Sequence, residues 1–122
     1  MANILVTGTS RGIGSAILNA LAGHNVVGHS TRGGDGQIAA DLASADQTRA
    51  LWWEAMGRLD GRIDVVINNA GIFEASAIEQ GDDAWTEAWE RTMRINLTAS
   101  AELCRFAVLH FRENGGGRDA YV

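Results

Sequence analysis

The sequence predicts an α/β fold in which helices cover both faces of a parallel sheet. Short apolar runs alternate with segments of helical spacing along the chain, a pattern typical of βαβ units. A glycine-rich turn joins the first apolar run to the first helical segment. The length of 122 residues fits a single domain, 1–122, and no linker or internal repeat divides it.

The first half of the chain carries the clearest elements. Residues 3–7 form an apolar run that stops at Gly8, as expected of a buried parallel strand. Residues 15–22 have helical spacing and end at Gly23, a good helix terminator. A second strand is expected at residues 26–30 and a weak third strand at 37–40. A second helix is expected at 46–56 and a fourth strand at 63–67.

The second half predicts one long helix. It begins after a cap at Asp82 or Asp83, continues over residues 85–112, and ends at the glycines 115–117. Apolar side chains occupy more than one side of this helix, so it requires burial on several sides. Because residues 118–122 do not look like an apolar strand, we expect a sheet truncated after about four strands. The fourth strand would then be an exposed edge.

Composition narrows the classes of function. Hydrophobic residues make up 46% of the chain, an ordinary globular composition that argues against disorder. The net charge of −5 disfavours nucleic acid and anionic membranes as partners. No apolar run is long enough to span a bilayer, and no signal peptide precedes the first strand. We therefore expect a cytoplasmic protein. The single cysteine, Cys104, is expected in the core, and the three histidines are too scattered to predict a metal site.

The glycine-rich turn is the strongest local signal for a binding site. Gly8, Gly12 and Gly14 lie between a predicted strand and a predicted helix. Glycines in this position let the backbone approach a pyrophosphate, and the helix that follows offers free amides and its positive dipole end. In a βαβ context, this turn predicts a doubly wound sheet of the Rossmann type that binds a dinucleotide.

Four segments together resemble the short-chain dehydrogenase/reductase family. Thr7 to Gly14 resembles its T-G-x-x-x-G-x-G signature, Asp41-Leu42 its adenine-contacting pair, and Asn68 to Gly71 its N-N-A-G segment. Asn96 resembles the asparagine of the family's catalytic tetrad, and is the catalytic residue that we predict. The resemblance covers almost the whole chain, but only about the first half of a typical member. The predicted cofactor-binding residues are Gly8, Ser10, Arg11, Gly12, Ile13, Gly14, Arg32, Asp41, Leu42, Asn69, Ala70 and Gly71.

Charged residues near the turn predict NADP(H) in preference to NAD(H). An acid at the end of the second strand would favour NAD by bonding the ribose hydroxyls. Here that strand ends in His29-Ser30-Thr31-Arg32, without an acid. Arg32 and Arg11 both suit contact with a 2′-phosphate. A purely solvating role for either arginine remains an alternative.

The resemblance also shows what this chain lacks. Family members use a serine, and a tyrosine with a lysine four residues later, for hydride transfer to or from a carbonyl or alcohol substrate. This chain contains no lysine, and its one tyrosine, Tyr121, is the penultimate residue. A frameshift, an early stop or a fragment boundary would each give this pattern. We therefore expect a catalytically incomplete chain.

Three functions remain open at this point. The chain could represent the N-terminal part of an NADP(H)-dependent oxidoreductase, or a non-catalytic dinucleotide-binding module that partners a full-length relative. A methyltransferase-like domain also uses a glycine-rich turn, but it would not explain Asn68 to Gly71 or Asn96. In intact relatives the long helix forms part of a dimer. The resemblance therefore implies self-association through residues 85–112.

Overall fold

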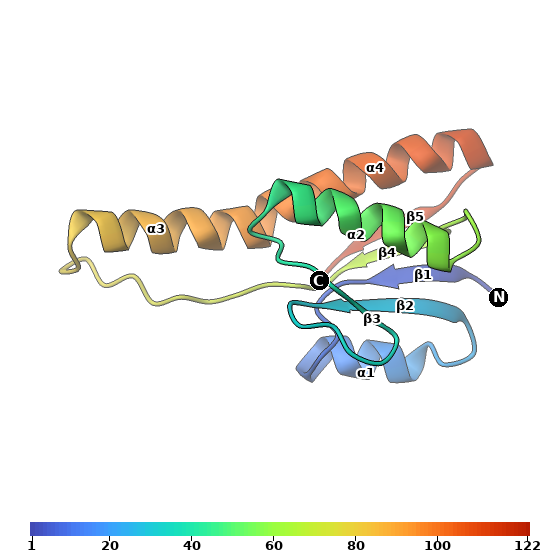
Figure 1. The fold of residues 1–122 in the computed structure, drawn as a ribbon, viewed down its shortest axis with the longest axis horizontal. Helices are drawn as coiled ribbons and strands as arrows, with labels where there is room; N and C mark the ends of the chain where they lie inside the picture. Colours follow the sequence, from blue (N-terminus) through green and yellow to red (C-terminus); the bar gives the residue numbers. More distant parts are fainter.

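The fold is built on one parallel sheet of five strands. The computed structural model describes all of residues 1–122, with the strands in the order β3-β2-β1-β4-β5 (Figure 1). The strands are β1 (Asn3–Val6), β2 (Asn25–Ser30), β3 (Gln37–Ala39), β4 (Val65–Asn68) and β5 (Arg118–Tyr121). The order reverses between β1 and β4, which makes the sheet doubly wound. This confirms the predicted α/β fold of the Rossmann type.

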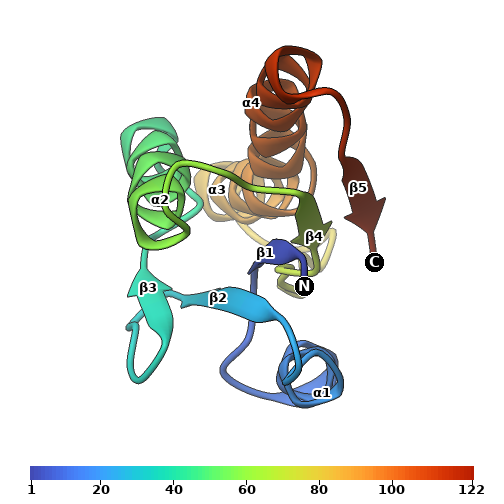
Figure 2. The same cartoon turned by 90° about the vertical axis from the view of Figure 1, so that its right-hand side faces the viewer.

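Helices cover the two faces of the sheet unequally. The helical elements are α1 (Gly12–Ala20), α2 (Ala45–Arg58), α3 (Asp82–Met93), the π-helical segment η1 (Arg94–Thr98) and α4 (Ala99–Asn114). Figure 2 shows α2 and α4 on one face and α1 alone on the other. The α3 helix projects beyond the end of the sheet (Figure 1). None of these helices combines the length and the hydropathy that crossing a bilayer requires.

The main core lies between the sheet and the pair α2 and α4. Leu5 of β1 is paired with Val66 of β4, and both side chains are fully buried in a cluster of 15 residues. Trp52 of α2, with 1% of its surface exposed, stacks on Phe106 of α4 at 6.0 Å. Since side chains alternate along a strand, the neighbours of Leu5 face α1 instead.

The fifth strand corrects the prediction that residues 63–67 form an exposed edge of the sheet. The β5 strand pairs in parallel with β4, and the amide of Arg118 donates to the carbonyl of Asp64 at 3.0 Å. At the other end, the amide of Val122 donates to Asn68. Gly115 ends α4 with φ +82° and turns the chain back toward β4. The strand that follows is then held by backbone hydrogen bonds to β4. Hydrophobic patterning does not detect such a strand.

The long helix of the second half also differs from its prediction. It begins at Asp82 with Gly81 as its N-cap, so Asp82 and Asp83 occupy the first turn and do not cap it. It is interrupted by the π-helical segment η1, which contains Asn96, and it ends at Asn114. No residue of α3 is buried. The sequence therefore indicated the helix but not the change of winding inside it.

Candidate functional site

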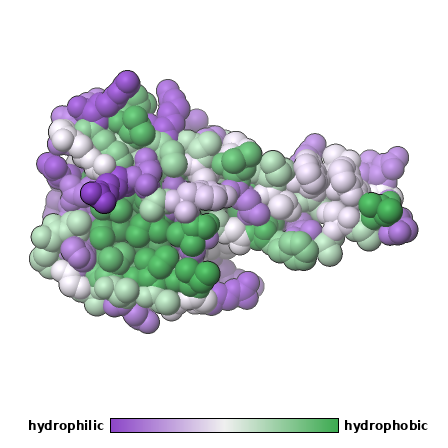
Figure 3. All heavy atoms as spheres, turned by 180° about the vertical axis from the view of Figure 1, so that it is seen from behind, coloured by the Kyte–Doolittle hydropathy of each residue, from purple (hydrophilic) through white to green (hydrophobic).

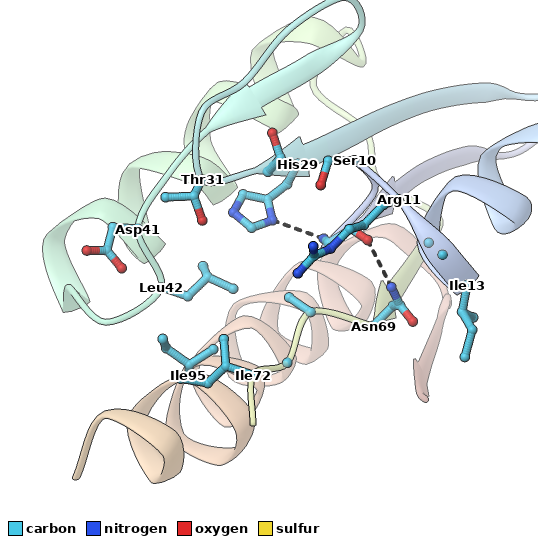
Figure 4. A pocket seen from close by; sticks show the side chains of 16 residues that line it. Ser10, Arg11, Ile13, His29, Thr31, Asp41, Leu42, Asn69, Ile72 and Ile95 are labelled. Carbon is cyan, nitrogen blue, oxygen red and sulfur yellow. Dashed lines mark hydrogen bonds between the residues drawn. The ribbon is translucent and has the colours of Figure 1, made fainter. Parts of the chain in front are cut away.

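A cavity of about 370 Å³ opens at the carboxyl ends of the strands, where the strand order reverses. In doubly wound sheets this crevice is the usual place for a ligand. The turn after β1 and the segments after β2, β3 and β4 surround it, and Ile95 closes one side (Figure 4). The lining residues are Gly8, Ser10, Arg11, Gly12, Ile13, Gly14, His29, Ser30, Thr31, Asp41, Leu42, Asn69, Ala70, Gly71, Ile72 and Ile95.

The segment after β4 fixes the glycine turn from one side. The hydroxyl oxygen of Thr7 accepts hydrogen bonds from the amides of Asn69 and Ala70, at 3.1 and 3.0 Å. The side-chain amide of Asn69 donates to the carbonyl of Gly8 at 3.0 Å. Two segments that lie about sixty residues apart in the sequence are therefore held together by three polar contacts.

Two glycines of the turn have a steric reason to lack a side chain. Gly8 has φ +70°, and a Cβ there would stand 2.7 Å from the Cα of Ala70. A Cβ on Gly14 would overlap the carbonyl oxygen of Gly8 and stand 2.7 Å from Nδ2 of Asn69. Close backbone approach between the turn and the segment after β4 therefore depends on both glycines.

The N-terminus of α1 faces the cavity with its amides free. The helix begins at Gly12, and the preceding Arg11 makes no side-chain capping bond. No acidic residue lies in the first turn. Because unpaired amides and the positive end of the helix dipole attract anions, this wall of the cavity is suited to a phosphate group.

The structure brings together all the predicted cofactor residues except Arg32. That arginine is exposed in the turn after β2 and does not line the cavity. Arg11 does line it, with its side chain extending into the cavity (Figure 4). The lining residues that sequence reasoning missed are His29, Ser30, Thr31, Ile72 and Ile95. The position of the second strand's end could have indicated the first three, because all parallel strands end at this edge.

Asn96 lies behind the cavity wall, where its side chain forms hydrogen bonds with the backbone of Ile72. Its Oδ1 accepts from the amide of Ile72 at 2.7 Å, and its Nδ2 donates to the carbonyl of the same residue at 2.8 Å. Its own carbonyl accepts from the hydroxyl of Tyr121 at 2.8 Å. Asn96 therefore positions the segment after β4, and its predicted catalytic role stays a prediction.

His29 is a buried polar residue of the cavity wall, with 3% of its surface exposed. Its Nδ1 lies 3.1 Å from the amide of Gly8, and its Nε2 lies 2.8 Å from the carbonyl of Ala40. Burial lowers the pKa of His29 below its usual value of 6.5, and the Ala40 carbonyl opposes this in part. The imidazole is consequently neutral at neutral pH.

Cys104 offers no activated nucleophile. It is half-buried on α4, where the side-chain amide of Asn68 donates to its sulfur at 3.4 Å. Burial raises the pKa of the Cys104 thiol, and the nearby Asp119 carboxylate raises it further. The protonated thiol is a poor nucleophile. No group of three or more His, Cys, Asp or Glu side chains converges elsewhere in the structure.

Comparison with known proteins connects this site to one family. A model of the short chain dehydrogenase family matches residues 30–118. The chain is 33% identical to the short chain dehydrogenase/reductase dpchG of Colletotrichum higginsianum, covering 85% of this chain and 44% of that protein. It is 34% identical to the D-beta-hydroxybutyrate dehydrogenase of Cupriavidus necator, covering 93% and 49%. The chain thus spans about half the length of the curated relatives it matches.

Solved structures agree with the sequence relatives. An NADH-dependent reductase A1-R′ complexed with NAD superposes with a TM-score of 0.81 at 26% identity, covering 97% of this chain and 57% of that one. A short chain dehydrogenase from Burkholderia cenocepacia J2315 in complex with NADP gives a TM-score of 0.75 at 26% identity, covering 89% and 50%.

Proposed function

This chain belongs to the short chain dehydrogenase family, and we propose that its cavity binds a nicotinamide dinucleotide. The observation that carries the proposal is the glycine turn, which brings free helical amides to the cavity and is fixed by Thr7 and Asn69. A diphosphate fits this wall, since Gly8 and Gly14 leave backbone where a side chain would stand. The remaining cavity is lined by Asp41, Leu42, Gly71 and their neighbours.

We propose further that the chain prefers NADP(H) to NAD(H). No acidic side chain stands at residues 31–34, directly after β2, where one would repel a 2′-phosphate, and the hydroxyls of Ser30 and Thr31 line this part of the cavity instead. Arg11 adds a guanidinium to the same cavity. Arg32 lies outside the lining, so the preference rests chiefly on Arg11 and on the missing acid.

Titration of the purified chain with NADPH and NADH tests both proposals. Arg11→Ala should weaken NADPH binding by about tenfold, as expected for loss of one charge-assisted phosphate contact, and should affect NADH much less. Arg58→Ala is the matched control, because Arg58 is an exposed arginine paired with Glu54 at 2.8 Å, away from the cavity. Absence of binding by a folded chain would refute the site, equal wild-type affinities for NADPH and NADH would refute the preference, and equal losses in Arg11→Ala would refute the role of Arg11 in it.

The family's chemistry is hydride transfer, which a bound dinucleotide would supply to a carbonyl or alcohol carbon. This chain's residues provide the binding wall and Asn96, but no lysine and no tyrosine facing the cavity. The hydroxyl of Tyr121 is occupied by the carbonyl of Asn96. We therefore propose that residues 1–122 supply the dinucleotide-binding part of a short-chain oxidoreductase and do not by themselves complete a hydride-transfer site.

An activity measurement separates this proposal from catalysis by the chain itself. Purified residues 1–122 should give no turnover of NADPH with carbonyl substrates above the rate without protein. Turnover that disappears in a Tyr121→Phe variant would instead assign the proton transfer to Tyr121. Turnover that survives this change would require another acid, and would equally refute the proposal.

A further inference from the structure

We propose that His29 is a positioning residue that holds the first amide of the glycine turn only while its imidazole is neutral, so that dinucleotide affinity falls when His29 is protonated. The affinity part rests on the proposed function, whereas the hydrogen bond itself can be tested without any ligand. The proposal follows from the contacts of the ring, its burial and the absence of a charged partner.

The imidazole joins two segments of the cavity wall. Its Nδ1 faces the amide of Gly8 at 3.1 Å, and its Nε2 faces the carbonyl of Ala40 at 2.8 Å. The backbone of His29 is fixed as well, since its carbonyl and amide both bond to Thr9. Figure 4 shows the ring pointing across the cavity wall toward the glycine turn.

Hydrogen-bond chemistry permits only one form of this ring. The amide of Gly8 is a donor, so Nδ1 must present a lone pair. The carbonyl of Ala40 is an acceptor, so Nε2 must carry the proton. Both contacts are therefore satisfied only by the neutral Nε2–H tautomer. A second proton on Nδ1 would place two donors face to face and break the contact with Gly8.

No charged side chain pairs with the ring to compensate a positive charge. The charged side chains near this wall are Arg11 after β1, Arg32 after β2 and Asp41 after β3. None of them forms a hydrogen bond or an ion pair with His29. Burial is consequently the main influence on the pKa of His29 and lowers it, so that the neutral form holds the contact at neutral pH.

Protonation of His29 should act on the binding wall directly. Gly8 also accepts from Asn69 through its carbonyl, so the turn is held between β2 on one side and the segment after β4 on the other. Protonation removes the bond that holds the Gly8 amide on this side, while the bonds between Thr9 and the backbone of His29 remain. The turn next to the diphosphate position is then held less firmly, and preorganisation is reduced.

The ligand-free test is NMR of the wild-type chain labelled with ¹⁵N. The contact predicts the Nε2–H tautomer for His29 and a scalar coupling between Nδ1 and the amide nitrogen of Gly8. Both signals should vanish together as the pH falls below the ordinary histidine pKa, about 6.5. An Nδ1–H tautomer at neutral pH, or an amide of Gly8 that is insensitive to the titration, would overturn the proposal.

The binding test uses NAD⁺ as the probe and two variants of His29 whose side chains are similar in size to each other. NAD⁺ has no phosphate monoester, whose own pKa of about 6 would confuse the titration. In His29→Asn, the side-chain oxygen replaces Nδ1 as the acceptor for Gly8. In His29→Leu, no acceptor remains, and an unsatisfied amide should weaken binding by about tenfold. His24→Asn is the matched control, since exposed His24 bonds Ala2 far from the cavity.

The pH profile distinguishes positioning from a merely structural role. Wild type and His24→Asn should lose NAD⁺ affinity as the pH falls through the His29 titration. His29→Asn should bind within about twofold of wild type at neutral pH and show a flat profile. A profile in His29→Asn that matches wild type would refute the role of His29. If wild type binds no NAD⁺ at any pH while the NMR coupling is present, the cofactor proposal fails and the hydrogen bond stands.

Discussion

Gly14 marks the place where the glycine turn and the segment after β4 come closest. A Cβ there would overlap the carbonyl of Gly8 and approach the side-chain amide of Asn69, both of which belong to the binding wall. Gly14→Ala should therefore destabilise the fold by about 1–3 kcal/mol, the usual range for overpacking, and abolish measurable dinucleotide binding. Chemical denaturation and a cofactor titration measure the two effects.

A second glycine provides the control for this substitution. Gly57 lies within α2, and a Cβ there would meet nothing within 4 Å. Gly57→Ala should raise the free energy of unfolding by about 0.5–1 kcal/mol, because alanine favours the helix, and should leave binding unchanged. If Gly14→Ala behaved like Gly57→Ala in both measurements, the packing described for the turn would be wrong.

Among single residues, the sequence predicted those whose role depends on the backbone geometry of the glycine turn, and it did not predict those whose role depends on side-chain contacts formed in the fold. Gly8, Gly14 and Asn69 follow from the motif, because their spacing reflects steric demands that any ligand-binding turn of this kind shares. His29 was not predicted as a site residue. An isolated histidine in a strand carries no spacing signal, and its two hydrogen bonds depend on where β3 and the turn meet it in space.

At the scale of elements, η1 connects the site to the long helix. Its Asn96 makes two hydrogen bonds to the backbone of Ile72, a residue that lines the cavity. Asn96→Ala would leave the amide and the carbonyl of Ile72 without partners, at a cost of about 1–3 kcal/mol for each group that stays buried. We expect a lower melting temperature, weaker cofactor binding, and faster hydrogen exchange at the Ile72 amide.

Thr92→Ala is the control for Asn96→Ala. Thr92 lies in the preceding turn, and its hydroxyl bonds only to the carbonyl of Ala88 within the same helix. This variant should change the exchange of the Ile72 amide very little. Equal protection of Ile72 in wild type and Asn96→Ala would show that the side chain of Asn96 does not position this segment.

The sequence predicted those helices and strands whose apolar residues are spaced by packing against the core. The β1 strand and α2 carry side chains of the main core, so their apolar positions are visible in the sequence. The β5 strand has four exposed residues, and only its backbone hydrogen bonds to β4 define it. The π-helical winding at Asn96 is likewise a matter of backbone geometry, which hydrophobic spacing does not encode.

At the scale of the whole molecule, two apolar surfaces are left open. The first is the sheet face that α1 covers in part, where Figure 3 shows a broad hydrophobic area. Val65 and Ile67 of β4 lie on this side because they alternate with the core residue Val66, and both are only half-buried. The second is α3, whose stacked Trp85 and Trp89 lie 5.5 Å apart with no buried neighbour in the helix. Large exposed apolar surfaces favour association.

We predict that the chain self-associates through residues 85–112, and an exposed tryptophan on α3 allows this to be tested. Trp89 has 53% of its surface exposed and belongs to a helix with no buried residue, so Trp89→Glu should leave the fold intact. Trp53, with 59% exposed, lies on α2 beside Leu109 of α4 and not on α3, which makes Trp53→Glu a control for the α3 part of the surface. Sedimentation velocity over a range of concentrations should show association for wild type and for Trp53→Glu. In Trp89→Glu the association should weaken by at least about tenfold, since an interfacial tryptophan is often worth 2 kcal/mol or more.

Association that persists in Trp89→Glu would exclude α3 and point to the open face of the sheet. The charge added at Ile67 by Ile67→Lys would then be expected to prevent it.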